Sequence, residues 1–436
     1  MYFSTDGQYA VKVFNRQNPD LEKHLRYVMT IFANLQEDHK RFIVPPLALL
    51  DAFDGEPHPG FAMRRVPPRY RKAIELILTP KQAAAQFSRG STWGSYLLAA
   101  RSMAHAIAVL HNKGCAHTDI HYDNFHVDID EGDAVMMEAD GVVVAGGFVK
   151  PRVAGRRGFM APEILTEHAR PSKFTDRHSL AVLVLHTLLF RNPLEPLIEY
   201  SDDQDESVRL GWGERALFSE DSRDRRHRPK YVGVPLYSEG ALSYRMLTPQ
   251  LQRVTEEALI SGLHEPSRRP STRDWMEALA ASLDQLWACE RCGQRFPYPY
   301  WLDPWARRAC PFCGERCHRP LPVVLALWEE GRTGSFAPIG RALVLGHGSP
   351  LYADMAEPHR LPPRTRRGVP TIGYAAWDAS HHAYQLVNNS DGLWVSLQGT
   401  GQPTKVAKGQ ALLLRPKTMI RLGGGQRVVE VIDAGG

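Results

Sequence analysis

The chain has 436 residues, of which 43% are hydrophobic and 23% are charged. These proportions are ordinary for a soluble globular protein and exclude a disordered or fibrous chain. The formal net charge of +5 is too small to indicate nucleic-acid binding, so we expect the basic clusters at residues 223–228 and 360–367 to be solvated loops. The length predicts about two to four domains.

Cysteine spacing and hydropathy indicate in which cellular environment the protein is expected to work. Five of the six cysteines fall between Cys289 and Cys317, which favours metal ligation over a disulfide framework. The longest strongly apolar run, residues 180–190, is too short to cross a bilayer of about 30 Å, and we expect no membrane partner. The first residues lack the pattern of a secretion signal, so we expect a cytoplasmic protein.

Strand and helix patterns follow one another along the first part of the chain. We expect, in chain order, a β-hairpin, a helix and two further strands, over residues 1–14, 21–35, 42–50 and 60–64. From residue 96 to about residue 287 the apolar spacing is mostly helical. Strands followed by helices predict an α+β unit with two lobes.

The residues that carry chemistry follow an apolar helix that ends near Gly114. They are His117, then Asp119 two positions on, and Asn124 after four intervening residues. Phosphoryl transfer needs a carboxylate that orients the attacking hydroxyl and accepts its proton, which suits Asp119. It also needs oxygen ligands for the magnesium on the phosphates, which suits Asn124. The pattern resembles the catalytic loop of protein kinases, in which His117 would be structural.

Further motifs occur along the chain in the same order as in protein kinases. The apolar strand at residues 10–13 contains Lys12, which resembles the lysine that holds the α- and β-phosphates. Glu163 closes an Ala-Pro-Glu motif like the one that ends the activation segment. The resemblance pairs Glu163 with Arg269, and it gives Asp176 the role of bracing the catalytic loop from below.

These motifs together resemble bacterial Ser/Thr protein kinases of the eukaryotic type. The resemblance implies a bilobal fold over residues 1–285, with an N-lobe at about 1–66 and a C-lobe at about 67–285. It also implies transfer of the γ-phosphate of ATP, with Mg²⁺, to a protein substrate. Some relatives act beside a metal-dependent phosphatase and a von Willebrand-type protein, which are therefore candidate partners.

Parts of the family pattern are altered. The chain begins at what resembles the second strand, so the N-lobe is truncated at its start and lacks the Gly-rich loop over the phosphates. The magnesium-binding Asp-Phe-Gly is replaced by the sequence at residues 137–141. Spacing favours Glu138 as the metal ligand, whereas the following glycine favours Asp140. Glu22 is the candidate partner of Lys12, or alternatively a charge that favours the helix N-terminus.

The regulatory positions differ as well. Thr118 replaces the arginine that usually receives an activation-loop phosphate, and residues 141–160 contain no Ser, Thr or Tyr. We therefore predict constitutive activity or control by partners, rather than phosphorylation of this segment. His121 replaces a lysine that is common in Ser/Thr kinases, so the sequence leaves the preferred hydroxyl open.

A zinc ribbon is predicted over residues 286–319. Two Cys-x-x-Cys-Gly knuckles, 17 residues apart, can supply four thiolates to one tetrahedral Zn²⁺. A closed site of this kind is structural, because it leaves no open coordination position. Aromatic residues between the knuckles could stack on nucleic-acid bases, but packing around the metal is the preferred interpretation. The predicted zinc ligands are Cys289, Cys292, Cys310 and Cys313.

Residues 320–436 are predicted to form an all-β domain. Glycines, prolines and alternating apolar residues dominate this segment. Its second half resembles a forkhead-associated β-sandwich, a domain that reads phosphothreonine and accompanies many bacterial kinases. The Arg and Ser that would hold phosphate are not found in its first half, so a plain β-sandwich interaction module is preferred.

Three functions follow from these patterns. The first is an active protein kinase that uses Lys12, Asp119 and Asn124, with Asp140 or Glu138. The second is a pseudokinase scaffold that binds partners without phosphoryl transfer. The third, binding of nucleic acid through the ribbon, is the least favoured.

Overall fold

The computed structural model describes residues 1–14, 19–50, 52, 59–144, 155–302, 309–318, 320–331, 334–357, 361–397, 403–423 and 427–433. The chain forms two compact units. The first comprises Met1–Gly233, Glu239–Tyr244 and Arg253–Met276. The second comprises Val234–Ser238, Arg245–Gln252 and Glu277–Gly436.

The first unit begins with a small antiparallel sheet in the order β1-β2-β4-β3. The β1–β2 pairing confirms the expected hairpin, which turns at Gly7 with a left-handed φ of +69°. The apolar face of α1 packs on the sheet, where Leu25 shares a core with Phe61 and Met63. The elements of this region are β1 (Tyr2–Phe3), β2 (Tyr9–Val13), α1 (Pro19–Ala33), α2 (Glu37–Lys40), β3 (Ala48–Leu50) and β4 (Gly60–Arg64).

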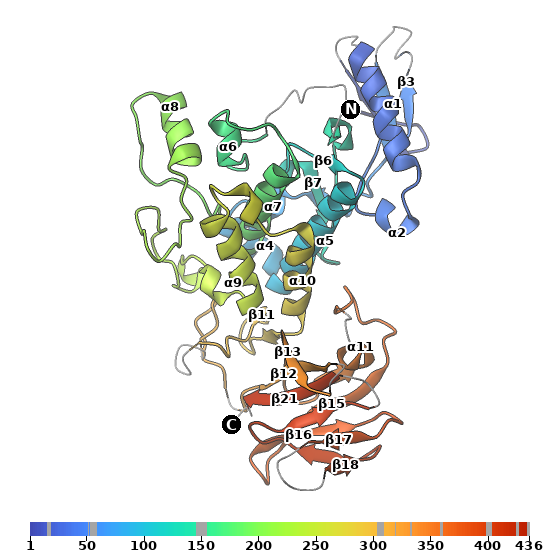
Figure 1. Cartoon of the computed structure of the whole chain (residues 1–436), viewed down its shortest axis with the longest axis vertical. Helices are drawn as coiled ribbons and strands as arrows, with labels where there is room; N and C mark the ends of the chain where they lie inside the picture. Colours follow the sequence, from blue (N-terminus) through green and yellow to red (C-terminus); the bar gives the residue numbers. More distant parts are fainter. Residues whose placement is uncertain are drawn as a thin grey trace. The chain divides into compact units, whose positions relative to one another are not determined.

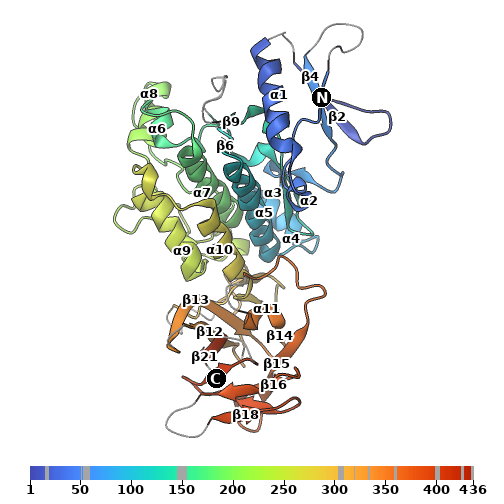
Figure 2. The same cartoon turned by 45° about the vertical axis from the view of Figure 1, so that its right-hand side comes forward.

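Two buried helices form the centre of the first unit. Helices α5 (Trp93–Asn112) and α7 (Lys173–Leu189) lie side by side in both views (Figure 1, Figure 2). Trp93 Nε1 donates a hydrogen bond to the Leu188 carbonyl at 2.8 Å and ties one helix to the other. The other helices between residues 74 and 283 are α3 (Ile74–Ile77), α4 (Pro80–Phe87), α6 (Pro162–Leu165), α8 (Gln204–Val208), α9 (Pro249–Glu256) and α10 (Thr272–Leu283).

The structure departs from the expected elements in two places. The expected strand at residues 42–50 is reduced to β3, because Pro45 and Pro46 have no N–H to donate to a sheet. Short strands interrupt the region expected to be helical, because two to four residues carry too little periodicity to be recognised. The short strands of this unit are β5 (Arg71–Lys72), β6 (Cys115–Ala116), β7 (Phe125–Asp128), β8 (Asp133–Met136) and β9 (Val143–Val144).

The second unit contains two larger antiparallel sheets, drawn in orange to red in Figure 1. Their strand orders are β13-β12-β21-β20-β17-β18 and β14-β15-β16-β19, and residues such as Leu325 and Leu386 from both sheets share one core. The elements are β12 (Val323–Glu330), β13 (Phe336–Leu345), β14 (Pro350–Tyr352), α11 (Ala353–Ala356), β15 (Thr371–Asp378), β16 (Ala383–Asn388), β17 (Trp394–Ser396), β18 (Thr404–Val406), β19 (Ala411–Leu413), β20 (Met419–Arg421) and β21 (Arg427–Asp433).

The cysteine-rich segment precedes these sheets within the second unit. It begins with a hairpin of β10 (Leu286–Ala288) and β11 (Arg295–Pro297). The side chains of Trp287 and Tyr300 pack against Val324 and Val344 of the larger sheet. The mixture of helices and strands in the whole chain agrees with the expected α+β class. Among the described helices, none combines the length and the apolarity that a membrane span requires.

Candidate active site and metal centre

Asp119 and Asn124 lie in the loop between β6 and β7, which ends in a 3-10 turn at Tyr122–Asn124. The amide nitrogen Nδ2 of Asn124 donates to the backbone oxygen of Asp119 at 2.8 Å and lies 3.3 Å from its Oδ2. Asn124 is buried, whereas the side chain of Asp119 is 24% exposed. The loop therefore presents one accessible carboxylate with an amide group fixed beside it.

Asp176, at the start of α7, holds this loop from within the protein. Its carboxylate accepts hydrogen bonds from the backbone nitrogens of His117, at 2.8 Å, and Thr118, at 3.2 Å. The same carboxylate lies 3.0 Å from His111 Nε2. Thr118 has a φ of +66°, a strained conformation for a β-branched residue, and Asp176 holds it there. Asp176 thus contacts the backbone of this loop, and its role as a brace stays a prediction.

Two histidines lie near the carboxylate of Asp119. His121 Nε2 lies 3.2 Å from Asp119 Oδ1, and His121 Nδ1 accepts a hydrogen bond from the Asp123 nitrogen. Burial alone would raise the pKa of Asp119, but the contact with His121 and the nearby charge of His117 outweigh it and lower that pKa. Asp119 is therefore held as a carboxylate, the form that can accept a proton.

Lys12 on β2 reaches the segment that stands in place of Asp-Phe-Gly. Its Nζ lies 2.8 Å from Asp140 Oδ2 and 4.0 Å from Glu138 Oε1. The Asp140 side chain is 9% exposed and that of Glu138 is 52% exposed. The second oxygen of Asp140, Oδ1, is buried and has no hydrogen-bond partner among the described residues. A buried carboxylate oxygen without a donor fits a metal ligand, so this geometry favours Asp140 over Glu138.

Helix α1 approaches the same segment through a residue that the sequence analysis missed. The expected pairing of Glu22 with Lys12 is not found among the described residues: Glu22 lies one helical turn from Arg26 and pairs with it at 2.7 Å. His24 instead lies with its Nε2 2.9 Å from the Asp140 backbone oxygen. Helical spacing from the buried Leu25 and Val28 was the available signal, since it places position 24 near the inward face of α1.

Two ion pairs anchor the segment that ends in the Ala-Pro-Glu motif. Arg269 donates to both carboxylate oxygens of Glu163, at 2.7 and 2.8 Å, and the guanidinium is fully buried. Arg156 forms an ion pair with Asp123 of the catalytic loop and lies 4.7 Å from the Tyr122 ring centroid. The sequence analysis did not single out this second pair. Within residues 141–160, where no Ser, Thr or Tyr occurs, positions 145–154 lie outside the described residues.

The four predicted zinc ligands come together in the second unit. The sulfur atoms of Cys289, Cys292, Cys310 and Cys313 all lie within 4.8 Å of one another. The pairs Cys289–Cys313 and Cys292–Cys310 are each separated by 3.7 Å. Tetrahedral zinc with Zn–S bonds of about 2.3 Å requires S···S distances of about 3.8 Å, so the donor set fits zinc.

Glycines complete both knuckles of this cluster. Gly293 and Gly314 have left-handed φ angles of +70° and +74°. Their nitrogens donate to the carbonyls of Cys289 and Cys310, at 2.8 and 2.9 Å, and close each tight turn. Cys317 follows the second knuckle but does not belong to the four-sulfur cluster.

Comparison with known proteins connects this chain with one class of enzyme, the protein kinases. No family model matches the chain. Two similar proteins are Protein kinase YegI of Escherichia coli (strain K12), 24% identical over 313 residues, and Protein kinase YegI of Escherichia coli O157:H7, 24% identical over 319 residues. Each match covers 70% of this chain and 45% of the relative, so the chain spans about half the length of these relatives.

Proposed function

We propose that the chain is a protein kinase that transfers the γ-phosphate of ATP to a Ser or Thr hydroxyl of a protein substrate in bacterial signalling. One observation carries the proposal: Asn124 lies beside Asp119, and Lys12 contacts Asp140. These residues carry the carboxylate, amide and amino groups that phosphoryl transfer would use. The low-identity relation to proteins named as kinases supports the same class.

Each residue has a separate task in this proposal. MgATP, when bound, supplies the phosphoryl group and the metal that neutralises its charge. Lys12 would bind phosphate oxygens of the nucleotide, and Asn124 and Asp140 would hold the magnesium. Asp119 orients the substrate hydroxyl and accepts its proton. Glu138 stays exposed at the edge of the site and serves as the second acidic group.

The remaining parts of the chain would support partner binding. We propose the boundaries 1–285 for the kinase domain, 286–319 for a structural zinc ribbon and 320–436 for a β-sandwich interaction module. The protein substrate, a metal-dependent phosphatase and a von Willebrand-type protein are the partners that the family resemblance suggests.

A pseudokinase scaffold is the second candidate function. Lys12 already has an ion partner in Asp140, and MgATP would have to displace that contact. The loss of this ion pair would oppose nucleotide binding.

The test is transfer of label from γ-labelled ATP, with Mg²⁺, to the chain itself and to a generic protein substrate. We expect labelling by the native chain and a loss of at least about 100-fold in Asp119→Asn, since general-base catalysis contributes 10²–10⁴-fold. Asp130→Asn is the matched control, because Asp130 is exposed and is not one of the proposed site residues. Equal labelling in the native and Asp119→Asn chains, or none in either, would contradict the kinase assignment and leave the scaffold.

A further inference from the structure

Helix α1 contacts the segment that contains Asp140 through the side chain of His24. The ring nitrogen Nε2 of His24 lies 2.9 Å from the backbone oxygen of Asp140. A carbonyl oxygen can only accept a hydrogen bond, so Nε2 carries the hydrogen and donates it. No second donor to this oxygen is found in the part of the chain that the structure describes. The backbone of Asp140 therefore relies on α1 for this bond.

Contacts from two other elements hold the turn around Asp140. Within the turn, the Gly141 nitrogen donates to the Glu138 carbonyl at 3.2 Å, and Glu138 has a left-handed φ of +55°. That conformation is unfavourable for a residue other than glycine, so its surroundings must maintain it. Lys12 of β2 holds one carboxylate oxygen of Asp140 at 2.8 Å, and His24 of α1 holds its backbone oxygen. The two elements thus hold Asp140 at two separate atoms.

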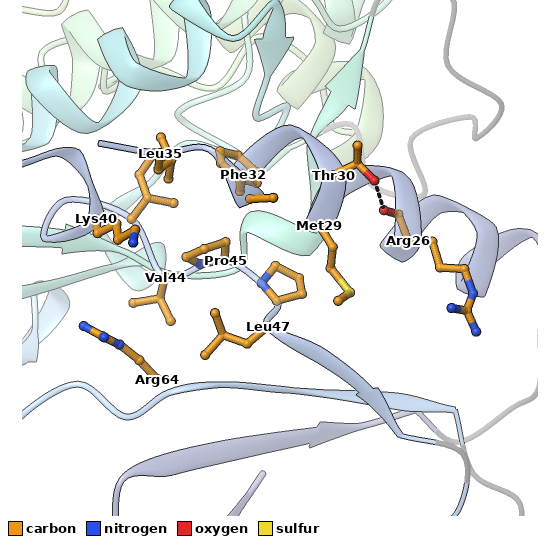
Figure 3. Close-up of a pocket in the computed structure, with 13 residues that line it drawn as sticks. Arg26, Met29, Thr30, Phe32, Leu35, Lys40, Val44, Pro45, Leu47 and Arg64 are labelled. Carbon is orange, nitrogen blue, oxygen red and sulfur yellow. Dashed lines mark hydrogen bonds between the residues drawn. The ribbon is translucent and has the colours of Figure 1, made fainter. Parts of the chain in front are cut away.

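Among the described residues, α1 makes no ion pair with Lys12. Glu22 pairs instead with Arg26 of the same helix at 2.7 Å, and both side chains are more than half exposed. Farther along α1, Met29 and Phe32 line a pocket of about 530 Å³ (Figure 3), so open space borders that part of the helix. The bond from His24 is therefore the polar contact by which α1 can act on the proposed active site.

We propose that His24 is a positioning residue for the metal-binding carboxylate of Asp140. This inference rests on the proposed kinase function, in which Asp140 ligates the magnesium of MgATP. The bond to the backbone oxygen keeps the unpartnered carboxylate oxygen, Oδ1, in its buried orientation. Without the bond the turn occupies other orientations for part of the time, and the apparent affinity for magnesium falls with the competent fraction. Saturating magnesium selects the competent orientation again, so the maximal rate is preserved.

Two substitutions separate the hydrogen-bond donor from the bulk of the side chain. His24→Gln keeps an N–H donor at a similar distance from the backbone as Nε2, whereas His24→Leu keeps a large side chain without a donor. Glutamine and leucine both favour helices, so the two variants preserve α1 to a similar extent. Glu22→Gln is the matched control two positions away, because Glu22 is exposed and pairs with Arg26.

Hydrogen exchange of the full chain without nucleotide examines the turn independently of activity. We expect the amides of residues 138–144 to exchange at least about fivefold faster in His24→Leu, because the turn loses an outside contact. His24→Gln and Glu22→Gln should stay within about twofold of the native rates, and the amides of α5 are the internal reference for intact folding. Native rates in His24→Leu, equally fast exchange in both His24 variants, or faster exchange in Glu22→Gln would overturn the proposal.

Phosphoryl transfer at a series of magnesium concentrations tests the consequence for the site. We expect His24→Leu to need at least about fivefold more magnesium for half-maximal activity, with kcat at saturating magnesium within about twofold of the native value. His24→Gln should restore the native magnesium dependence. A lower kcat with an unchanged magnesium dependence would contradict the proposal, since His24 would then act elsewhere. Faster exchange in His24→Leu in a chain that transfers no phosphate would contradict the kinase function while supporting the positioning of Asp140.

Discussion

The carboxylates of Asp140 and Glu138 differ in burial although only one residue separates them. Asp140 has a buried, unpartnered oxygen beside Lys12, whereas Glu138 is mostly exposed and has a left-handed φ of +55°. This arrangement predicts that Asp140→Asn lowers kcat/KM by at least about 100-fold, since the site loses the electrostatic part of its metal binding. Glu138→Gln should change it by less than about tenfold.

The measurement is kcat/KM at several magnesium concentrations for both variants. High magnesium should restore part of the activity of Asp140→Asn, because the metal affinity is what that substitution lowers. A larger loss in Glu138→Gln than in Asp140→Asn would show that the register favoured by spacing alone is the right one.

His186 on α7 makes the stability of the first unit dependent on pH. The ring is buried, stacks on Phe159 with centroids 6.1 Å apart, and burial lowers its pKa from 6.5 to about 4. The unfolded chain therefore takes up a proton below pH 6.5 that the folded chain does not take up until about pH 4. The stability that His186 contributes is complete above pH 6.5 and is lost as the pH falls from 6.5 to 4.

This predicts that the free energy of unfolding falls by about 2 kcal/mol between pH 7 and pH 5 on account of this one residue. Urea unfolding of the native chain and of His186→Gln at the two pH values measures the difference. His168→Gln is the control, because His168 is exposed. Identical pH dependence in the native chain and in His186→Gln would contradict the prediction.

At the residue level, the sequence identified candidate functional side chains only where they belong to one short local motif. Asp119 and Asn124 lie in one loop, and their spacing in the sequence was enough to identify them as candidates. Contacts between distant segments were missed: His24 and Asp140 are 116 positions apart, and Arg156 and Asp123 are 33 apart. Such contacts depend on tertiary packing, which a single sequence does not encode as a local spacing.

At the scale of elements, the ion pair between Arg156 and Asp123 connects the segment before the Ala-Pro-Glu motif to the loop that contains Asp119. Arg156 lies in residues 141–160, which contain no Ser, Thr or Tyr, so this contact needs no phosphate in that segment. Arg156→Asp should lower kcat/KM about 10- to 100-fold, because like charges displace the loop from its productive position.

The exchanged pair, Asp123→Arg with Arg156→Asp, should recover most of this loss, which kcat/KM for a peptide substrate measures. Arg157→Asp is the neighbouring control, since Arg157 is exposed and lies outside the pair. If the double exchange is as inactive as the single variant, the ion pair is not what positions the loop.

Helices were predicted better than short strands. The periodic segments at α1 and in α5 and α7 are long enough for several helical turns, and the structure contains each of them. Strands β6 and β9 have two residues each and pair with one another across the catalytic loop. Their existence follows from that pairing rather than from any pattern within them.

At the scale of the whole molecule, the cysteine cluster joins two knuckles that are far shorter than the sheets beside them. A zinc ion held by the four cysteines would couple metal binding to folding of this segment. We predict one zinc ion per chain by elemental analysis, and we expect Cys310→Ser to lose it. Cys317→Ser is the matched control and should retain it, because Cys317 lies outside the cluster.

Removal of zinc with a chelator should make residues 289–318 sensitive to proteolysis and lower the melting temperature of the second unit. A chain that keeps its melting temperature and protease resistance after zinc removal would contradict a structural metal. The two knuckles were predictable because their ligands are local in sequence. The pairing of β12 with β21, which joins the two parts of the larger sheet, spans about a hundred residues and was not predictable.

The ion pair between Glu163 and Arg269 can form only after the ribosome has synthesised both residues. Its two partners are 106 positions apart, so the ribosome makes Glu163 well before Arg269, whose guanidinium binds the Glu163 carboxylate. At about 5–20 residues per second this interval lasts roughly 5 to 20 s. Throughout it the nascent chain carries the segment that ends at Glu163 without this anchor. The pair between Glu163 and Arg269 therefore forms late, after most of the first unit has been synthesised.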